Sequence, residues 1–233
     1  MPPELTILMP VYNESARIGT ALDDVFRTDW PFAVELIVVD DGSTDGTRDF
    51  LRSYAWPEYA HLHLHERNQG KGGAVRTGLG HATGRFSVIF DADLEYQAAE
   101  LVQLVEPLRD GLANAAFGVR AFDGYTSHSF LYVMGNRFVT LAANVLFNVY
   151  LHDLMTCFKA IRTDIFRELR LRENGFTIEP EIAARLIQHG ERIYEVPISY
   201  RARSFEEGKK LTTRDGVRTL ATLVRCRLRS PSS

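Results

Sequence analysis

The chain has 233 residues, of which 45% are hydrophobic, and its formal net charge at pH 7 is -3. The hydrophobic content is ample for a core, and the slightly acidic balance gives no general attraction to nucleic acid. Two cysteines, Cys157 and Cys226, are too few for a disulfide framework and fit a reducing cytosol. We therefore expect a globular protein without a nucleic-acid partner.

The first half of the chain alternates between strand and helix patterns. Short β-rich runs each end in small or polar residues, and a helical pattern follows each of them, at residues 5–10, 35–41, 60–67 and 87–93. This alternation predicts an α/β fold with a mainly parallel sheet. Ligands of such sheets bind beyond the carboxyl ends of the strands, near the point where the strand order reverses.

The pattern is less regular after residue 115. Further strands are predicted at residues 115–120, 155–162 and 192–201. The longest apolar run, residues 130–151, is interrupted by Arg137 and by asparagines, which argues against a membrane span. We expect a long, mostly buried helix there, with partial contact at a membrane surface as the alternative, and a second helix at residues 180–190.

The C-terminal part combines a polar segment with a basic helix. Residues 201–216 are charged and glycine-bearing, which predicts a mobile loop. A last helix is expected to follow, with Asp215 as a candidate N-cap, and its arginines alternate with leucines and valines. This pattern favours either transient contact with an anionic membrane surface or a packed helix with a solvated basic edge.

The start of the chain carries no pattern of a secretory signal. The segment MPPELTILMPVYNE lacks a basic start and a long apolar core. We therefore expect a cytoplasmic protein, with contact at the inner face of the membrane as a further expectation. The chain shows no repeat or linker, so one domain over residues 1–233 is the simplest prediction.

A buried strand pattern stops at closely spaced carboxylates in the segment SVIFDADLEYQ. In an extended backbone Asp91, Asp93 and Glu95 occupy alternate positions, so all three side chains are expected on one side. Such carboxylates repel one another unless a cation lies between them, and Mg²⁺ takes oxygen ligands together with substrate phosphates. The segment therefore predicts a divalent-cation site.

Two other loops carry candidate binding residues. Asp40 and Asp41 follow the run ELIVV, where an acid can accept hydrogen bonds from a ribose or a base, or can begin a turn. In NQGKGG the backbone, Asn68 and Lys71 either face a diphosphate or form an ordinary turn. The glycine spacing differs from nucleotide-binding phosphate loops and from G-x-G-x-x-G, which disfavours ATP hydrolysis and hydride transfer.

Three histidines alternate along the third predicted strand. His61, His63 and His65 would share one face, which is a pattern compatible with zinc. If the strand lies at the edge of the sheet, they instead mark its wetter face, and we favour this interpretation.

Seven ordered blocks of the chain are similar to one known family. The blocks are ILMPVYNESARI, IVVDDGSTDGT, NQGKGGAVRTGL, FDADLEY, DLMTCFKAIR, FTIEPEI and EVPISYRARSFEEGKKLTTRDG. Together they resemble the family 2 glycosyltransferases of GT-A fold, and within that family the branch that makes dolichyl-phosphate or polyprenyl-phosphate sugars. The resemblance implies a Rossmann-like three-layer domain that transfers a sugar, with inversion, from a GDP- or UDP-linked donor.

The resemblance also implies roles for single residues on the donor side. Pro10, Tyr12 and Glu14 match the block that holds the nucleobase, and Asp41 matches the acid near the nucleoside. Further donor-side positions are expected at Asn68, Lys71, Ala92, Lys209 and Lys210. The donor side is expected within residues 1–115.

The Asp-x-Asp block implies a Mg²⁺ or Mn²⁺ cofactor. Asp93 matches the direct metal ligand and Asp91 the residue beside the ribose and the metal. Glu95 stands where many relatives have glutamine, as a second candidate ligand. Cys157 departs from the pattern, because it occupies the place of a glycine in many relatives.

The acceptor is expected within residues 116–233, and its chemistry decides what the site must supply. A hydroxyl needs a general base, and Glu179 and Glu181 lie where many hydroxyl-glycosylating relatives carry theirs. A phosphate monoester is already largely a dianion at neutral pH and needs positive charge instead. Arginines that resemble the family's phosphate-binding ones are Arg120, Arg137 and Arg203.

These features predict a lipid phosphate acceptor, such as a polyprenyl or dolichyl phosphate. A family 2 enzyme that acts on a hydroxyl of a polysaccharide or small molecule is the alternative. A non-catalytic sensor of sugar nucleotides is a more distant alternative, because a sensor would not need the carboxylates of a metal site.

Overall fold

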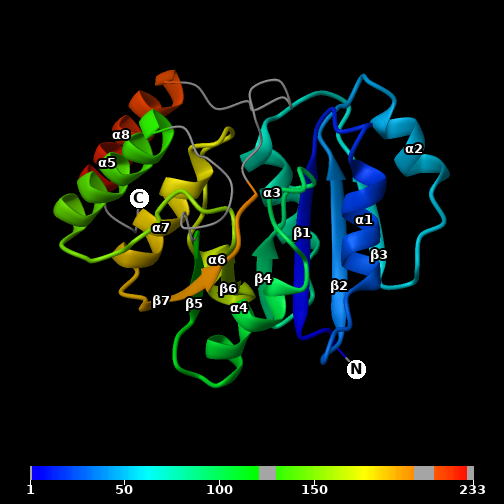
Figure 1. Ribbon diagram of the computed structural model, residues 1–233, viewed down its shortest axis with the longest axis horizontal. Coiled ribbons are helices and arrows are strands. Elements are labelled where there is room, and N and C mark those ends of the chain that lie inside the picture. Colours follow the sequence, from blue (N-terminus) through cyan, green and yellow to red (C-terminus); the bar gives the residue numbers. More distant parts are fainter. Residues whose placement is uncertain (1, 121–129, 202–212, 230–233) are drawn as a thin grey trace.

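The computed structural model describes residues 2–120, 130–201 and 213–229 (Figure 1). The strands of this part form one seven-stranded sheet in the order β3-β2-β1-β4-β6-β5-β7. Their bounds are β1 Leu5–Val11, β2 Val34–Asp40, β3 Ala60–Leu64, β4 Phe86–Ile89, β5 Ala115–Arg120, β6 Lys159–Arg162 and β7 Ile193–Ile198. The pairing is parallel except for β6, which runs antiparallel to both β4 and β5. The predicted α/β fold with a mainly parallel sheet is confirmed.

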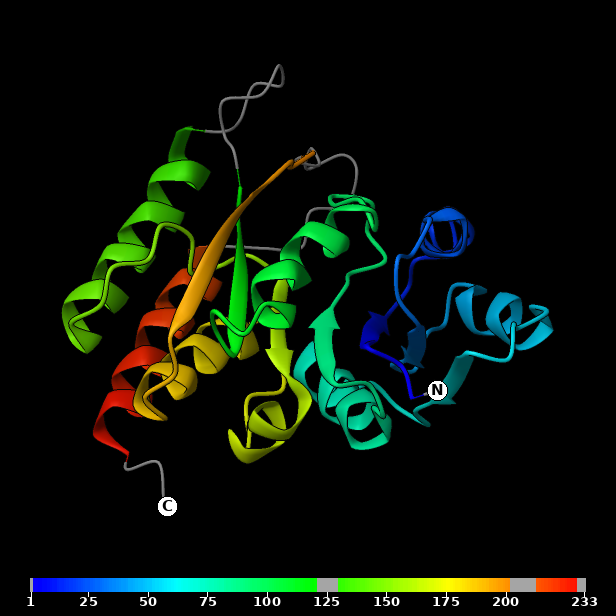
Figure 2. The same ribbon diagram turned by 90° about the horizontal axis from the view of Figure 1, so that it is seen from below.

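Helices cover both faces of the sheet, so the molecule has three layers (Figure 2). The helices are α1 Ile18–Arg27, α2 Thr47–Ser53, α3 Lys71–His81, α4 Glu100–Arg109, α5 Phe130–Phe147, α6 Thr163–Glu168, α7 Ile178–Gln188 and α8 Thr213–Leu228. One hydrophobic core lies under α1, α2 and α4, and a second under α3, α6 and α7, with α5 and α8 packed beside α7. In α1 the buried side chains are Ile18, Ala21, Leu22 and Val25, which is the spacing of one helical face.

The strand order reverses between β1 and β4. From β1 the chain adds β2 and then β3 on one side, and it continues with β4 on the other side. In doubly wound sheets this reversal opens a crevice at the carboxyl ends of the strands. The segments after β1 and β4 therefore meet at one edge of the sheet.

The direction of β6 brings a third segment to the same edge. Because β6 is antiparallel to β4, its amino end lies beside the carboxyl end of β4. Met155 and Cys157 precede β6, and both consequently lie near Asp91, which follows β4.

Several predicted boundaries were wrong. The strand that was expected to include Asp91 and Asp93 ends at Ile89, and the chain turns after it, with Leu94 at φ 63°. The strand predicted from residue 155 begins only at Lys159, because the preceding residues form the pocket wall. The last helix begins at Thr213, so Asp215 is not its N-cap.

The long helix α5 is less buried than expected. Val139 and Ala143 lie in the core, whereas Phe138 and Leu141 are exposed on the opposite side. The expectation of a mostly buried helix was therefore wrong, because α5 packs on α7 and α8 with one face only. Within the described residues, none of the helices combines the length and hydrophobicity needed to cross a bilayer.

The glycines before and within α3 allow a distant segment to approach closely. Gly72 N donates a hydrogen bond to Asn174 O at 2.7 Å, and a Cβ atom at Gly72 would overlap Glu173 O. Gly70 has φ 83°, a conformation that favours glycine, and its Cβ would overlap Asn174 O. The glycines of NQGKGG thus join the amino end of α3 to the segment that leads into α7.

We predict that Gly72→Ala lowers the free energy of unfolding by about 1–3 kcal/mol, because the new methyl group displaces the backbone at Glu173. Gly80→Ala in the same helix is the matched control. A Cβ at Gly80 meets no atom within 4 Å, so this change should stabilise the protein by about 0.5–1 kcal/mol. Urea unfolding of both variants measures the difference, and equal midpoints would contradict the close-approach argument.

Candidate active site

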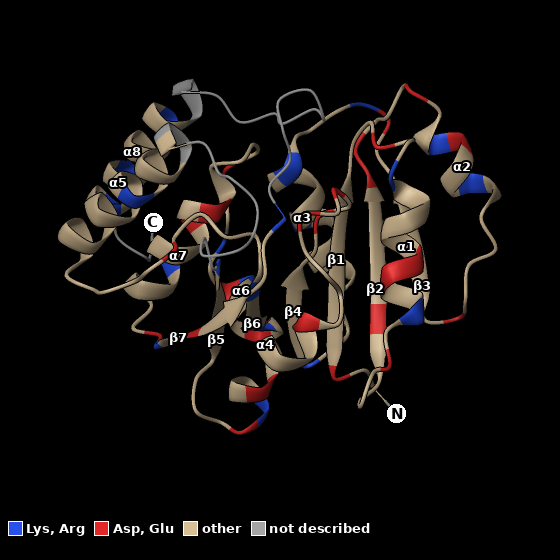
Figure 3. Ribbon diagram, in the orientation of Figure 1, with Lys and Arg blue, Asp and Glu red and all other residues tan. Residues whose placement is uncertain are grey.

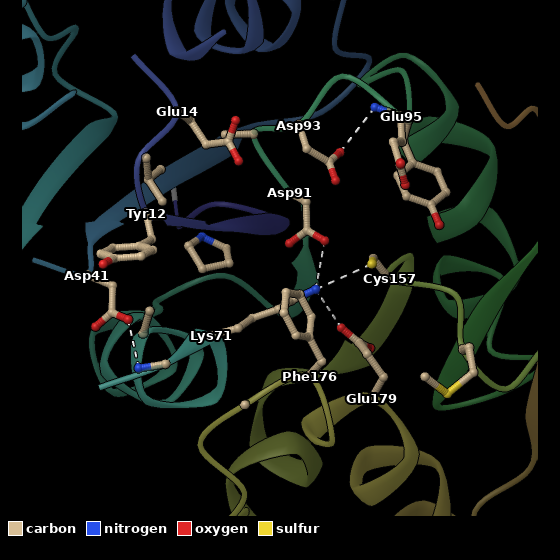
Figure 4. A pocket seen from close by; sticks show the side chains of 18 of the residues that line it. Tyr12, Glu14, Asp41, Lys71, Asp91, Asp93, Glu95, Cys157, Phe176 and Glu179 are labelled. Carbon is tan, nitrogen blue, oxygen red and sulfur yellow. Dashed lines mark hydrogen bonds and ion pairs between the residues drawn. The ribbon is translucent and has the colours of Figure 1, made fainter. Parts of the chain in front are cut away.

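A pocket of about 340 Å³ lies at the reversal point of the sheet (Figure 4). Segments from both halves of the chain line it, including those that follow β1, β2 and β4, the amino end of α3, the residues before β6 and the start of α7. Its acidic lining residues are Glu14, Asp41, Asp91, Asp93, Glu95 and Glu179, and its basic ones are Lys71 and Arg120. The location predicted for a ligand site from the strand pattern thus coincides with this pocket.

The turn after β1 forms one wall of the pocket. Pro10, Tyr12 and Glu14 all line it, and the Tyr12 side chain is 38% exposed. Two hydrogen bonds join this turn to the GSTDGT segment. Asn13 N donates to Ser43 Oγ at 3.0 Å, and Thr44 N donates to Asn13 Oδ1 at 2.8 Å. The Tyr12 ring is therefore presented to the pocket by a turn whose backbone is fixed.

Asp45 strengthens the same connection. Its carboxylate accepts hydrogen bonds from Ser15 N at 3.0 Å and from Thr47 Oγ1 at 2.5 Å. Partial burial alone would raise the pKa of Asp45, but the hydrogen bonds from Thr47 and Ser15 lower it to about 2. The spacing of the polar GSTDGT residues did not predict this bracing role.

Asp41 organises the loop that follows β3. Its carboxylate accepts hydrogen bonds from Gln69 N at 2.8 Å and from Gly70 N at 2.7 Å, and it contacts His65 Nδ1 at 2.7 Å. Asn68 Nδ2 donates to the Asp41 carbonyl at 3.2 Å, so the loop is bonded to Asp41 at several points. Both backbone N–H groups therefore point at Asp41, which favours the alternative of an ordinary turn over that of a backbone that faces a diphosphate.

Asp40 holds the turn that had been considered for Asp41. It is fully buried, pairs with Arg48 at 2.7 Å and accepts a hydrogen bond from Ser43 N at 3.3 Å. Asp41, by contrast, lines the pocket. The alternative in which Asp41 begins the turn was wrong.

The three alternating histidines do not share one environment. His61 is exposed, His63 stacks on His81 with ring centroids 3.9 Å apart, and His65 is buried between Asp41 and Thr77. The strand is at the edge of the sheet, as expected, but a common wet face was wrong, because β3 ends at Leu64. In residues 2–120, 130–201 and 213–229, no three His, Cys, Asp or Glu side chains are grouped closely enough to hold a metal ion by themselves.

The carboxylates of the FDADLEY block engage different partners. Asp91 pairs with Lys71 at 2.7 Å, Asp93 accepts a hydrogen bond from Glu95 N at 3.1 Å, and Glu95 accepts one from Tyr200 OH at 3.0 Å. The extended backbone expected for this block was wrong, because β4 ends at Ile89 and the chain turns after it. All three residues nevertheless line the pocket.

Lys71 lies at the centre of the pocket floor. Its ammonium group lies 2.7 Å from Asp91 Oδ2, 2.8 Å from Glu179 Oε1 and 3.3 Å from Cys157 Sγ (Figure 4). The contact to Glu179 is an ion pair rather than an aligned hydrogen bond. Burial alone would lower the pKa of Lys71, but the charges of Asp91 and Glu179 raise it well above its usual range. Lys71 is therefore a permanent cation that ties the β4 end to α7.

The ion pairs continue into the core. Glu179 Oε2 lies 2.9 Å from Lys159 Nζ, and Lys159 is fully buried. The result is a chain of alternating charges from Asp91 through Lys71 and Glu179 to Lys159. Cys157 lies beside it, and burial, followed by the charge of Asp91, raises the pKa of its thiol well above the usual range.

Glu181 does not line the pocket with Glu179. Its carboxylate accepts hydrogen bonds from Arg172 N at 3.0 Å and Glu173 N at 2.8 Å, and it lies 4.0 Å from Arg185. These contacts hold the segment that docks on α3. The position of Glu181 thus disfavours the alternative in which it acts as a general base.

Arg120 lines the pocket from the end of β5 and is held by Asp153. Its Nε and second terminal nitrogen contact the two carboxylate oxygens of Asp153 at 2.6 and 2.8 Å, and Asn136 Nδ2 donates to the same carboxylate at 3.1 Å. Burial alone would raise the pKa of Asp153, but Arg120 lowers it. Arg120 is thus a buried, bidentate partner rather than a surface ion pair.

The family model described as Glycosyl transferase family 2 matches residues 6–170, which include the β1 turn, the α3 loop, the FDADLEY block and the residues before β6. The chain belongs to glycosyltransferase family 2. It is therefore a glycosyltransferase by family, and the resemblance found in its sequence blocks is confirmed.

Relatives and solved structures agree with this assignment. Glycosyltransferase AglJ of Haloferax volcanii is 30% identical over 201 residues, which are 85% of this chain and 63% of that protein. Dodecaprenyl-phosphate galacturonate synthase of Rhizobium johnstonii is 28% identical over 206 residues, which are 86% of this chain and 60% of that protein. The chain thus spans slightly less than two thirds of the length of either relative.

The fold resembles that of glucosyl-3-phosphoglycerate synthase from Mycobacterium tuberculosis. A crystal structure of that protein with Mn²⁺, uridine diphosphate and glucosyl-3-phosphoglycerate superposes with a TM-score of 0.74 at 21% identity, over 96% of this chain and 80% of that one. This similarity shows the GT-A fold for the present glycosyltransferase.

Some expected residues of the glycosyltransferase do not join the described pocket. Arg203, Lys209 and Lys210 lie outside the described residues, as does most of the predicted loop at 201–216. Arg137 is exposed on α5 and is not among the described residues that line the pocket, because it lies on the face of the helix turned away from the core. Ala92 lines the pocket as expected.

Other lining residues of the glycosyltransferase were missed from the sequence. Tyr96, Met155 and Phe176 contribute apolar surface to the pocket. The local sequence around them does not indicate a pocket. They reach it only because the chain turns after β4, because β6 runs antiparallel to β4, and because the segment before α7 docks on α3.

Lys71→Met should lower the free energy of unfolding by about 2–4 kcal/mol, because it leaves the partly buried Asp91 and the buried Glu179 without this cation. The double variant Lys71→Met with Asp91→Asn should recover part of this loss, since Glu179 still has Lys159 as a partner. Urea unfolding measures both variants. A double variant no more stable than the single one would contradict the ion-pair account.

Proposed function

We propose that the chain transfers a sugar, with inversion at the anomeric carbon, from a nucleotide diphosphate sugar to a polyprenyl or dolichyl phosphate. The main support for this proposal is that both glutamates considered as general bases are already bound to other groups of the protein. Glu179 is paired with Lys71 and Lys159, and Glu181 accepts backbone hydrogen bonds away from the pocket. A phosphate acceptor needs no base, whereas a hydroxyl acceptor does.

The donor nucleotide is assigned to the wall formed by the β1 turn. Tyr12 offers a partly exposed ring for stacking on a base, and Pro10 and Glu14 lie beside it. Asp41 and Asn68 border the same part of the pocket. A UDP donor is suggested by the solved structural relatives, some of which contain uridine diphosphate, and a GDP donor is the alternative.

The pocket suits a divalent cation by the chemistry of its lining. Among the described residues, six acidic side chains line it against two basic ones, and Lys71 and Arg120 are both already in ion pairs. A diphosphate brought to such a surface is repelled unless a cation accompanies it. We assign Asp93 as the protein ligand and Glu95 as a second candidate, while Asp91 is held by Lys71.

The chain's own residues orient the reacting groups around that cation. When bound, Mg²⁺ or Mn²⁺ supplies Lewis-acid stabilisation of the departing diphosphate. Lys71 and Glu179 present a charged floor at the centre of the pocket, and their mutual pairing keeps both side chains in position. Fixed groups of this kind contribute to catalysis because they need no reorganisation during the reaction.

The acceptor is assigned to the side of the pocket that is built by residues after 115. Arg120, Met155 and Phe176 line this side and combine one cation with apolar surface. The name of the Rhizobium relative, a dodecaprenyl-phosphate galacturonate synthase, supports a lipid phosphate as the acceptor class. The proposal includes a cytoplasmic location with transient contact at the inner face of the membrane.

Asp93→Asn should lower the rate of sugar transfer by about two orders of magnitude or more, because it removes the negative charge that we propose binds the cation. The matched control is Asp49→Asn on α2, an exposed acid outside the pocket lining. Mn²⁺ with UDP or GDP should raise the melting temperature of the unchanged chain but not of Asp93→Asn, since ligands stabilise the state that binds them. Transfer that survives EDTA would contradict the metal assignment.

The acceptor prediction compares a polyprenyl phosphate with the matching alcohol, given the same sugar nucleotide. We expect transfer to the phosphate, with a rate that falls as the pH drops below about 6, where the phosphate becomes a monoanion. Glu181→Gln should keep a substantial part of the rate, because Glu181 holds backbone and removes no proton.

Transfer to the alcohol alone would overturn the phosphate acceptor and favour the hydroxyl-directed alternative. Loss of that transfer in Glu179→Gln would then identify the base. Sugar nucleotide hydrolysis without any acceptor would exclude the non-catalytic sensor.

A further inference from the structure

An apolar stripe runs along the outer face of α5. Its members are large side chains between 43% and 75% exposed, namely Phe130, Met134, Phe138, Leu141 and Val145. Their spacing of three or four residues places them on one side of the helix, opposite the buried Val139 and Ala143. Single exposed apolar residues are common, but a contiguous stripe of this kind marks a binding surface.

The neighbouring helix α8 extends the apolar surface. Figures 1 and 2 both show α5 and α8 side by side at the end of the molecule opposite α2, and Arg227 Nε donates to Leu146 O at 3.0 Å between them. On α8 the exposed apolar side chains are Val217, Val224 and Leu228. They are spaced by seven and four residues, which places them on one side of the helix, so α8 also presents an apolar stripe.

The charges on this helix pair are almost all positive. The two helices carry five arginines and one aspartate, whereas the whole chain has a formal net charge of -3. Figure 3 shows blue segments and no red ones along the described parts of both helices. Arg137 lies on the exposed side of α5 next to the stripe.

We propose that the outer face of α5, with α8 beside it, docks on an anionic lipid bilayer surface. Apolar side chains flanked by arginines suit the boundary between acyl chains and anionic headgroups. A second copy of the chain fits less well, because a contact of the α5 stripe with itself would bring the exposed Arg137 of both copies together, and α5 carries no acidic residue that could pair with it. The charge of the helix pair therefore decides between the two occupants.

The docking face is connected to the pocket through the inner side of α5. Asn136 on that side donates to Asp153, which holds Arg120 at the pocket wall. Only residues 121–129 separate Arg120 from the start of α5. Docking would thus bring the acceptor side of the pocket to the membrane surface. This link to catalysis rests on the proposed lipid phosphate acceptor, whereas the docking surface does not.

The test measures co-sedimentation of the full chain with vesicles of phosphatidylcholine and phosphatidylglycerol, and with vesicles of phosphatidylcholine alone. Phe138→Asp should weaken binding to the anionic vesicles about tenfold or more, since burial of one large apolar side chain is worth at least that factor. Leu112→Asp is the matched control, because Leu112 is 61% exposed and Phe138 is 60% exposed. It should bind as the unchanged chain does.

Val145→Asp provides a second variant at the far end of the stripe, so the test does not depend on the folding of one protein. Binding should be weaker to phosphatidylcholine alone and should fall at high salt. Equal binding by Phe138→Asp, Val145→Asp and Leu112→Asp would overturn the proposal. A dimer of the unchanged chain that Phe138→Asp dissociates, without vesicle binding by either, would assign the stripe to a second copy and also overturn it.

A separate assay distinguishes failure of docking from failure of the proposed acceptor. With a short, water-soluble polyprenyl phosphate and no vesicles, Phe138→Asp should transfer sugar as well as the unchanged chain. Vesicle binding without any transfer to phosphates would leave the docking surface in place and overturn the acceptor. Transfer to the soluble phosphate without vesicle binding would support the acceptor and overturn the docking surface.

Discussion

The ion pairs of Lys71 hold the site together. The ammonium group stands between Asp91, which follows β4, and Glu179 on α7, so it joins the two halves of the chain at the floor of the pocket. The buried Glu179 and the partly buried Asp91 would repel each other without it. The glycines around Lys71 allow the segment before α7 to approach, which makes this bridge sterically feasible.

The same bridge determines the charge that the pocket offers to a ligand. Lys71 and Arg120 are the basic side chains among the described lining residues, and each is paired with carboxylates. The other charged side chains among the described lining residues are acidic, which suits a diphosphate only together with a cation. The acidic pocket and the basic pair α5 and α8 are thus separate surfaces with opposite charge, one suited to a metal-bound donor and the other to an anionic membrane.

Two features build the pocket wall that we propose for the acceptor. The reversed direction of β6 brings Met155 and Cys157 to the edge where the parallel strands end. The contacts from Asn136 through Asp153 to Arg120 then connect α5 to the same wall. The helix α5 therefore supports the pocket wall through Asn136 on one face and exposes an apolar stripe on the other.

The sequence by itself determined the fold class and family, and it identified Tyr12, Asp41, Lys71 and the Asp91 block as pocket residues, because strand ends and dense motifs are local signals. Only the tertiary structure decided how those groups are used. Asp91 turns to Lys71 and Glu181 turns to backbone amides, since a reversed strand and a docked loop bring together residues far apart in the chain. Periodicity could not predict such long-range pairs.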